Sequence, residues 1–347
     1  MNIQKLQGIL EKYKQPKFRL DQIKKAIFQE GIFEWDGITT ISKDLREVLK
    51  NELRILSFSV EKTLVSRDGQ SAKALLKLVD GNFLETVLMS PKPGTWSVCV
   101  SSQVGCPMNC GFCATGKMGF KRNLTAEEIA DQVLFWIQYL KNNQQPTTDN
   151  RQQNISNIVY MGMGEPFLNW IEVSQSLRDL IDEKIFNFAA RSISISTSGI
   201  AEGIEKLAEE FPQVNLALSL HFASDAQRSE IMPVNRKDNL ERLCGALQKY
   251  FAKTKRKVFL EYVMLANIND SRNDAEKLAR FIKSIGKLQL LHVNLIRYNS
   301  TDSEFKSSSK DATIKFKNNL EQNHIPVTIR KSLGDDIQGA CGQLAGK

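Results

Sequence analysis

Apolar strands and amphipathic helices alternate along most of this chain, from about residue 95 to residue 330. Strands that run parallel need a crossover of about a dozen residues or more, and a helix usually supplies it. The alternation therefore predicts a parallel sheet with right-handed crossovers. The expected strands are 95–100, 155–161, 191–196, 214–220, 257–264, 290–297 and 326–330, and the expected helices are 125–142, 170–183, 200–210, 238–251, 271–285 and 309–322.

Six strand–helix units in a row predict an α/β fold, a partial (βα)6 barrel that is an open relative of the eight-fold barrel. In such folds, ligands lie beyond the carboxyl ends of the strands. We assign the barrel to residues 93–331. The polar stretches 142–148 and 300–309 are expected to be surface loops.

The segments outside the barrel have patterns of their own. Residues 1–56 place apolar side chains four apart, as at Ile23 and Ile27, and predict a small N-terminal helical domain. Residues 57–92 change to a period of two around a hairpin-type turn at 80–82, which predicts a β-hairpin extension. Residues 332–347 are rich in glycine and predict a flexible C-terminal tail.

The overall composition limits the class of protein. The chain has 347 residues, of which 41% are hydrophobic and 25% charged, values that are ordinary for a folded protein with one large core. No apolar run approaches the roughly 18 residues of a membrane span, and the N-terminus lacks an apolar signal-peptide core. We therefore expect a cytoplasmic protein without a membrane partner, in which reducing conditions keep most of the six cysteines as thiols.

The chain is basic, with a formal net charge of +8 and a pI of about 9.1. Basic residues cluster at 253–257, near the C-terminus at 330–331, and at Lys117, Lys121 and Arg122. Such an excess suits a phosphate-bearing partner, and a basic surface without a partner explains it equally well.

Three cysteines on one short loop provide the strongest chemical signal. Cys106, Cys110 and Cys113 form a C-x3-C-x2-C pattern directly after the first expected barrel strand. Three thiolates can hold three irons of a four-iron cubane, which leaves one iron open for a small ligand. The alternative is a structural zinc site, which usually takes four ligands in two C-x2-C pairs, and no second pair follows in this sequence.

Polar residues also end the next three expected strands. Gly164 and Glu165 follow the second strand in a Gly-rich turn, Ser196 ends the third, and Ser219–His221 ends the fourth. Glu165 can accept hydrogen bonds from a ligand ammonium group, and hydroxyl or imidazole groups can bind a ribose or a carboxylate. Each residue alone would more often belong to a turn or a helix cap. Polar tips on four consecutive strands together favour a ligand site.

Three further cysteines lie outside the triplet. Cys99 ends the first strand, seven residues before Cys106. Cys341 lies in the glycine-rich tail, and a tail thiol that reaches the strand ends could act as a nucleophile or a redox partner. Cys244 falls on an amphipathic helix and is expected to be a small core residue.

The segment Gly105–Gly116 resembles the cluster loop of radical S-adenosylmethionine (SAM) enzymes. Within them, nearly the whole chain resembles the bacterial methyltransferases that modify ring carbon 2 of an adenine in 23S ribosomal RNA and, in many bacteria, adenine 37 of transfer RNA. The resemblance implies one 4Fe–4S cluster on the cysteine triplet and an electron donor such as flavodoxin or ferredoxin. It also implies an RNA-binding role for the N-terminal domain, and SAM contacts at Gly164, Glu165, Ser196, Ser219, Leu220, His221 and Asn299.

The resemblance further implies a route that uses two SAM molecules. Cys341 takes a methyl group from the first, and the second yields a radical that activates this methyl for addition to the adenine. Cys99 then forms a disulfide with Cys341 and releases the RNA. Glu85 is implied as the proton acceptor, with Cys99 as an alternative acceptor; without such a role, Glu85 would be an exposed strand residue.

Local departures from the family pattern leave undecided which ring carbon of the adenine is methylated. Residues 294–299 resemble the related resistance enzymes that methylate carbon 8, whereas 104–109 resemble the carbon-2 group. Ser300 and Phe222 also stand where the family usually has proline and a small residue. The alternatives are therefore a carbon-8 methyltransferase, a non-catalytic zinc RNA-binding protein and a radical activase of another protein.

Overall fold

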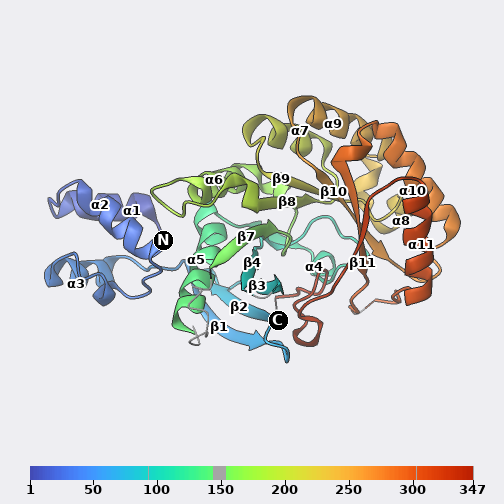
Figure 1. Ribbon diagram of the computed structural model, residues 1–347. Helices are drawn as coiled ribbons and strands as arrows, with labels where there is room; N and C mark the ends of the chain where they lie inside the picture. The colour runs from blue at the N-terminus through green and yellow to red at the C-terminus, as the bar shows by residue number, and fades with distance from the viewer. Residues whose placement is uncertain (93, 144–153, 302, 347) are drawn as a thin grey trace.

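The computed structural model describes residues 1–92, 94–143, 154–301 and 303–346. A ten-stranded sheet with the order β1-β2-β3-β4-β7-β8-β9-β10-β11-β12 forms its centre (Figure 1). The strands are β1 Phe58–Val65, β2 Ser71–Leu78, β3 Phe83–Lys92, β4 Thr95–Cys99, β5 Gln103–Gly105, β6 Phe120–Asn123, β7 Ile155–Tyr160, β8 Ile193–Thr197, β9 Asn215–Ser219, β10 Val258–Met264, β11 Leu291–Arg297 and β12 Val327–Arg330.

The helices alternate with the parallel strands as the sequence predicts. They are α1 Ile3–Lys12, α2 Phe18–Lys24, α3 Lys43–Glu52, α4 Ala114–Lys117, α5 Ala126–Asn142, α6 Trp170–Ile181, α7 Ala201–Glu210, α8 Asp225–Ile231, α9 Leu240–Lys253, α10 Arg272–Ile285 and α11 Lys310–Gln322. From β4 through β7 to β12 every neighbouring pair is parallel, and the covering helices lie along the outer side of the arc (Figure 1). The α/β fold with a partial barrel is therefore confirmed.

Strand β8 shows how side chains are divided between the two faces of the sheet. Ile193 and Ile195 are fully buried, while Ser194 and Ser196 are half-buried. Successive side chains of a strand point to opposite faces. The isoleucines therefore belong to the apolar core under the helices, and Ser196 belongs to the other face, at the carboxyl end of the strand.

An antiparallel extension continues the sheet beyond β4. The predicted hairpin is β2 and β3, which are joined at Gly81 with a φ of +81°, and β1 adds a third strand beside β2. Because β3 pairs with β4, the end of β3 lies against the strand that leads into the cysteine loop.

The helices α1 to α3 form a module at the N-terminal end that rests against α5 (Figure 1). Ile23 and Ile27, which are expected at helical spacing, are buried, and so are Leu45 and Leu49 of α3. Polar contacts join the module to α5: the N-terminal ammonium binds Asp131, and Lys141 donates to the Glu30 carbonyl. The domain boundaries drawn from the sequence stay a prediction.

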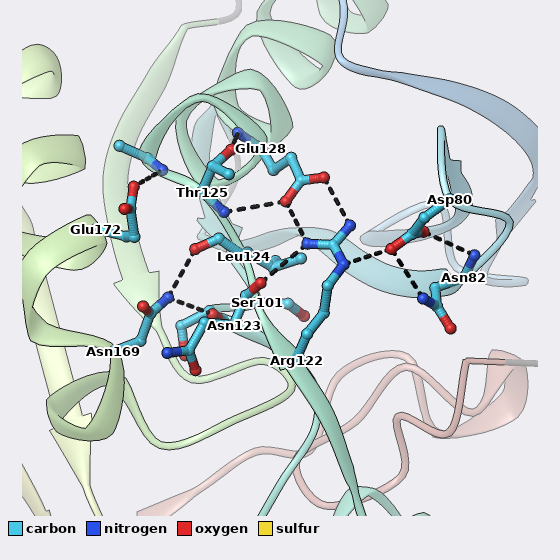
Figure 2. Close-up of polar contacts among 12 residues, drawn as sticks. Asp80, Asn82, Ser101, Arg122, Asn123, Leu124, Thr125, Glu128, Asn169 and Glu172 are labelled. Carbon is cyan, nitrogen blue, oxygen red and sulfur yellow. Dashed lines mark hydrogen bonds and ion pairs between the residues drawn. The ribbon is translucent and has the colours of Figure 1, made fainter.

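Arg122 joins the extension to the barrel at the base of the cysteine loop (Figure 2). Its guanidinium donates two 2.8 Å hydrogen bonds to the carboxylate of Glu128 and one of 2.5 Å to Asp80 in the β2–β3 turn. Glu128 also accepts from the backbone N–H of Thr125 at the start of α5, in a reciprocal capping arrangement. One side chain thus connects β6, α5 and the hairpin.

Within the described ranges, no helix is long and apolar enough to cross a membrane. Of the expected surface loop at 142–148, residues 144–148 lie outside the described part of the chain. The stretch 303–309 precedes α11 and contacts the barrel through an isolated bridge between Ser307 and Leu265.

We expect Arg122→Met to lower the free energy of unfolding by about 1–2 kcal/mol, because a two-pronged, partly buried ion pair is lost. Arg122→Lys should recover only part of this, since an ammonium group cannot make the fork. Urea unfolding of the purified variants measures the change. The matched control is Arg272→Met on α10, whose exposed pair with Glu276 should contribute less than about 0.5 kcal/mol. Equal losses at both sites would contradict the assignment.

Candidate active site

The loops that follow the parallel strands meet at one edge of the sheet. Glu165 after β7 receives a hydrogen bond from Ser198 after β8, and its backbone N–H donates to Gln103 after β4. The ring of Phe112 in the cysteine loop meets His221 after β9 edge to face, with centroids 4.9 Å apart. The structure therefore brings the strand-end residues predicted from the sequence together with the cysteine loop.

The cysteine loop is closed by a small hairpin made of β5 and β6. The N–H of Cys106 donates to the carbonyl of Gly119 at 2.9 Å. Gly105 has a φ of +75°, and a Cβ at this position would stand 1.9 Å from the Gly119 oxygen. Glycine is therefore required at position 105 for the loop to close.

The three thiols of the loop differ in burial but lie near one another. Cys110 is buried, whereas Cys106 and Cys113 are half-buried. Burial raises the pKa of Cys106 to about 12 and that of Cys110 well above its usual value. Thiolates in such a place need a neighbouring positive charge, which a metal centre would supply.

Among the described residues, no three His, Cys, Asp or Glu side chains are gathered as they would be around a single metal ion. A cubane differs from a single ion because each thiolate binds a different iron.

Glu165 is buried and accepts three hydrogen bonds within the protein. One carboxylate oxygen accepts from the N–H and hydroxyl of Ser198 at 2.6 and 2.8 Å, and the other accepts from the N–H of Phe167 at 3.2 Å. Burial raises the pKa of Glu165, and these hydrogen bonds oppose the rise. A carboxylate has about four acceptor positions, so contact with a ligand ammonium remains compatible with this arrangement.

Glycines bring the turn after β7 into close contact with the residues that precede the cysteine loop. A Cβ on Gly164, whose φ is +104°, would stand 2.6 Å from the Cβ of Gln103. A Cβ on Gly162 would stand 2.7 Å from the Ser101 hydroxyl. The glycines of this turn are thus needed for backbone packing, whatever ligand they also approach.

Two serines and a buried leucine occupy the next strand ends. The hydroxyls of Ser196 and Ser219 lie 3.3 Å apart and half-buried on neighbouring strands. Leu220 is buried, and its carbonyl accepts a 3.1 Å hydrogen bond from Arg228. The two serines therefore stay partly accessible, whereas the Leu220 carbonyl already accepts a hydrogen bond from within the protein.

His221 is buried in an unusual backbone conformation, with a φ of +56°. Its Nδ1 accepts the N–H of Val263 at 3.1 Å, which assigns the proton of the neutral ring to Nε2. Burial, with a smaller effect of the Arg228 charge, lowers the pKa of His221 to about 3. The ring is therefore a neutral hydrogen-bond donor at pH 7.

The C-terminal tail is held at the same edge of the sheet. Asn299 donates to the carbonyl of Cys341 at 3.1 Å, the N–H of Ala114 donates to Gly342 at 2.8 Å, and Thr115 donates to Leu344 at 2.6 Å. The expectation of a flexible tail was therefore wrong, because hydrogen bonds fasten it on both sides of Cys341.

Two of the three cysteines outside the triplet, Cys99 and Cys341, lie close enough for their charges to interact. Cys99 is buried at the end of β4, and burial, then the neighbouring Cys341, raise the pKa of its thiol. Cys341 is exposed to solvent. Loss of bulk water raises the pKa of Cys341, and the charge of Arg330 opposes this rise.

Comparison with known proteins identifies the family. A sequence model of the radical SAM superfamily matches residues 100–282, and one of the ribosomal RNA large subunit methyltransferase N-terminal domain matches residues 1–55. The chain is 41% identical over 342 residues to the ribosomal RNA large subunit methyltransferase Cfr of Clostridium botulinum (strain Langeland), an alignment that covers 98% of this chain and 96% of the relative.

A second relative is the probable dual-specificity RNA methyltransferase RlmN of Carboxydothermus hydrogenoformans, which is 40% identical over 348 residues, with 100% of this chain and 97% of the relative covered. The crystal structure of a radical SAM methyltransferase from Sphaerobacter thermophilus superposes with a TM-score of 0.92 at 38% identity, over 100% of this chain and 98% of that one. This chain belongs to the Cfr/RlmN family of radical SAM methyltransferases.

The residues present fit the cluster and SAM that a Cfr/RlmN-type enzyme uses. Three cysteine thiols on one loop are a suitable donor set for three irons of a cubane. The side-chain oxygen of Asn299 is buried and has no hydrogen-bond partner among the described residues. A buried acceptor without a partner is costly, and a hydroxyl or ammonium group of SAM would satisfy it.

The structure contradicts one of the two interpretations of Glu85 and leaves the other untested. Glu85 is 1% exposed, so it is no exposed strand residue. One oxygen pairs with Lys73 Nζ at 2.6 Å, and the other accepts the backbone N–H groups of Ala345 and Gly346 at 2.7 and 3.0 Å. A role as proton acceptor stays a prediction.

Some of the basic side chains form ion pairs with carboxylates of the same chain. Arg122 is paired as described above, Lys253 pairs with Glu209, and Arg330 lies 3.6 Å from Glu261. These cations are therefore less available to a phosphate than their sequence clusters indicate.

Sequence reasoning missed Arg228 of α8, which is fully buried. It donates to the carbonyls of Ser198 and Leu220 at 2.5 and 3.1 Å and to the side chain of Asn235 at 2.9 Å. It thereby holds the loops after β8 and β9 together beside the cysteines. A lone arginine in an amphipathic segment resembles a surface residue, and no sequence signal would have identified it.

We expect Gly105→Ala to abolish cluster incorporation, because the added methyl group would overlap the Gly119 carbonyl. Anaerobic reconstitution followed by iron analysis and visible absorbance measures this, and iron per chain should fall at least about tenfold. The control is Gly245→Ala in α9, where a Cβ meets nothing within 4 Å and iron should be unchanged. Zinc in place of iron in the parent protein would contradict the cluster assignment.

The lowered pKa of His221 makes stability depend on pH. The unfolded chain binds a proton below a pKa of about 6.5, whereas the folded protein resists it down to about 3, so stability falls as pH decreases through this window. Between pH 7 and pH 5 the contribution is about 2 kcal/mol. In His221→Asn, the loss of unfolding free energy over this range should shrink by that amount, as measured by urea unfolding of the cluster-free protein at both pH values. An unaltered pH dependence would show that His221 is not buried as described.

Proposed function

We propose that this enzyme methylates ring carbon 2 of an adenine in 23S ribosomal RNA, and the adenine at position 37 of transfer RNAs, through a methyl group carried on Cys341. The observation that carries the proposal is the hydrogen-bonded placement of the tail: Gly342 is bound to the residue after Cys113, and Cys341 itself to Asn299. This puts a solvent-accessible thiol beside the cysteine loop and the strand ends.

The residues of the chain account for each requirement of the reaction. Carbon 2 of adenine lies between two ring nitrogens and is too electron-poor to attack the methyl group of a sulfonium ion. A thiolate attacks such a methyl group readily. When bound, the cluster and SAM supply a methyl group and a 5′-deoxyadenosyl radical. Cys341 carries the methyl carbon to the base, and the carbon–sulfur bond must afterwards break.

Cys99 would complete that release. The adduct radical first loses one electron, for which the bound cluster would be the acceptor, and a base removes the proton from the ring carbon. The thiolate of Cys99 then attacks the sulfur of Cys341, a disulfide forms, and the carbon–sulfur bond breaks. The electron pair of that bond stays on the released methylene carbon, which takes up a proton and becomes the methyl group. The electrostatic interaction between the two thiols supports this pairing. Regeneration of the thiols and generation of the radical both need electrons, for which we propose a cytoplasmic donor such as flavodoxin or ferredoxin.

We propose that the RNA presents the adenine outside its base stack, because neither thiol nor radical can reach a stacked and paired base. The N-terminal module and exposed basic residues would hold phosphates, so affinity should fall steeply with salt. The candidate SAM contacts are Gly164, Glu165, Ser196, Ser219, Leu220, His221 and Asn299.

Methylation of carbon 8 is the second candidate. It is favoured by residues 294–299 and by relatives that carry the name Cfr, whereas 104–109 and the relative named RlmN favour carbon 2. Both reactions would use the same thiols, so the architecture described above serves either.

We expect RNA from cells that contain this protein to carry 2-methyladenosine, and RNA from cells without it to lack that nucleoside. Mass spectrometry of RNA digests, with both methyladenosines as standards, measures this; 8-methyladenosine alone would overturn the carbon-2 assignment.

The cysteine variants test the route. Cys341→Ala should reduce methylation more than about 100-fold, since the methyl carrier is lost. Cys99→Ala should leave RNA attached covalently to Cys341. The control Cys244→Ala alters a partly buried cysteine of α9 and should retain activity. Full methylation activity of Cys341→Ala would contradict the route.

A further inference from the structure

We propose that Glu85 and Lys73 form a clasp that fastens the C-terminal tail and so positions Cys341, which makes Glu85 a positioning residue. The inference rests on the proposed function in one respect, namely that Cys341 carries the methyl group. The contacts that define the clasp do not depend on it.

The clasp is built on the antiparallel extension. Leu75 of β2 lies opposite Glu85 of β3, and Lys73 is two residues from Leu75, so Lys73 and Glu85 share one face of the sheet as diagonal neighbours. Lys73 Nζ lies 2.6 Å from one carboxylate oxygen, and the two side chains are 7% and 1% exposed. A charge pair this deeply buried is costly unless further hydrogen bonds satisfy it.

Those further hydrogen bonds come from the tail. The second oxygen of Glu85 accepts the N–H groups of Ala345 and Gly346 at 2.7 and 3.0 Å, across more than 250 positions of sequence. Gly346 has a φ of +64°, and a Cβ there would stand 3.3 Å from the Phe83 carbonyl and 3.1 Å from Met118. The tail end is therefore shaped to reach this carboxylate.

The clasp is the outermost of three attachments that fix Cys341 from different elements. Asn299 beyond β11 binds the carbonyl of Cys341, and α4 of the cysteine loop binds Gly342 and Leu344. Glu85 binds the two residues that follow Leu344, so it determines where the last segment of the tail leaves the cysteine loop. Each oxygen of Glu85 thus has a partner within the protein, Lys73 for one and the tail for the other.

A proton acceptor and a clasp predict different results when Glu85 is replaced. A proton acceptor acts only on the RNA base, so its loss leaves the tail ordered and leaves methylation of Cys341 by SAM unaffected. A clasp acts before RNA binds, so its loss loosens residues 340–346 and slows the methylation of Cys341.

The test uses the full-length, cluster-reconstituted protein and hydrogen exchange measured by mass spectrometry. In Glu85→Gln, the amides of 340–346 should exchange about tenfold faster or more, since charge-assisted hydrogen bonds are weakened. The tail peptide should also acquire a methyl group from SAM about tenfold more slowly, in the absence of RNA. The matched control is Glu61→Gln on β1, an exposed glutamate that should change neither quantity.

Gly346→Ala is a second variant, which alters the tail and leaves the Lys73–Glu85 pair intact. It distinguishes loss of the clasp from a folding defect caused by breaking that pair. The strained backbone should loosen the tail as Glu85→Gln does. Unchanged exchange in both variants, with adenine methylation lost only in Glu85→Gln, would overturn the clasp and favour the proton acceptor. Hydrogen exchange needs no activity, so a protein that methylates no RNA would refute the proposed function while the exchange data still decide on the clasp.

Discussion

The structure depends on the constraint that all carboxyl ends of parallel strands meet at one edge of a sheet. The cysteine loop follows β4, Glu165 follows β7, Ser198 follows β8 and His221 follows β9. Residues that are far apart in sequence are thereby placed within hydrogen-bonding distance. The tail adds one more segment to this edge, since Thr115 binds the carbonyl of Leu344 across 229 positions of sequence.

This crowding explains why small residues and unusual backbone conformations gather there. The turn after β7 approaches the backbone of residues 100–103 so closely that Gly162 and Gly164 admit no side chain. His221 has a φ of +56°, and three hydrogen bonds hold it in this conformation. Its Nδ1 accepts from the N–H of Val263, its backbone N–H donates to the Glu261 carbonyl, and its carbonyl accepts from the side chain of Asn269. Such strain persists only where the surroundings determine the conformation.

The sequence predicts much of this arrangement, because strands, helices and the cysteine pattern are local signals. The expected strands and helices of the barrel lie within a few residues of those observed. The sequence is a poor guide to residues whose burial and hydrogen bonds depend on partners far away in the chain. Glu85 resembles an exposed strand residue until Lys73 and the tail are brought to it, and Arg228 resembles a surface residue until the loops after β8 and β9 surround it. The glycines of the tail indicate flexibility, whereas hydrogen bonds from α4 and Asn299 order it.

The two kinds of thiol at this edge differ in their access to solvent, although loss of water raises the pKa of both. Cys110 is buried within the cysteine loop, where burial raises its pKa and the charge of Arg228 opposes the rise; a bound metal would keep it as a thiolate. Cys341 also has a raised pKa, but Arg330 on β12 opposes the rise and the thiol stays accessible. A nucleophile must be able to lose its proton and still reach its target. Of the cysteines at the strand ends, Cys341 alone combines a neighbouring arginine with access to solvent, which is why its exact placement by the tail contacts matters more than its local sequence.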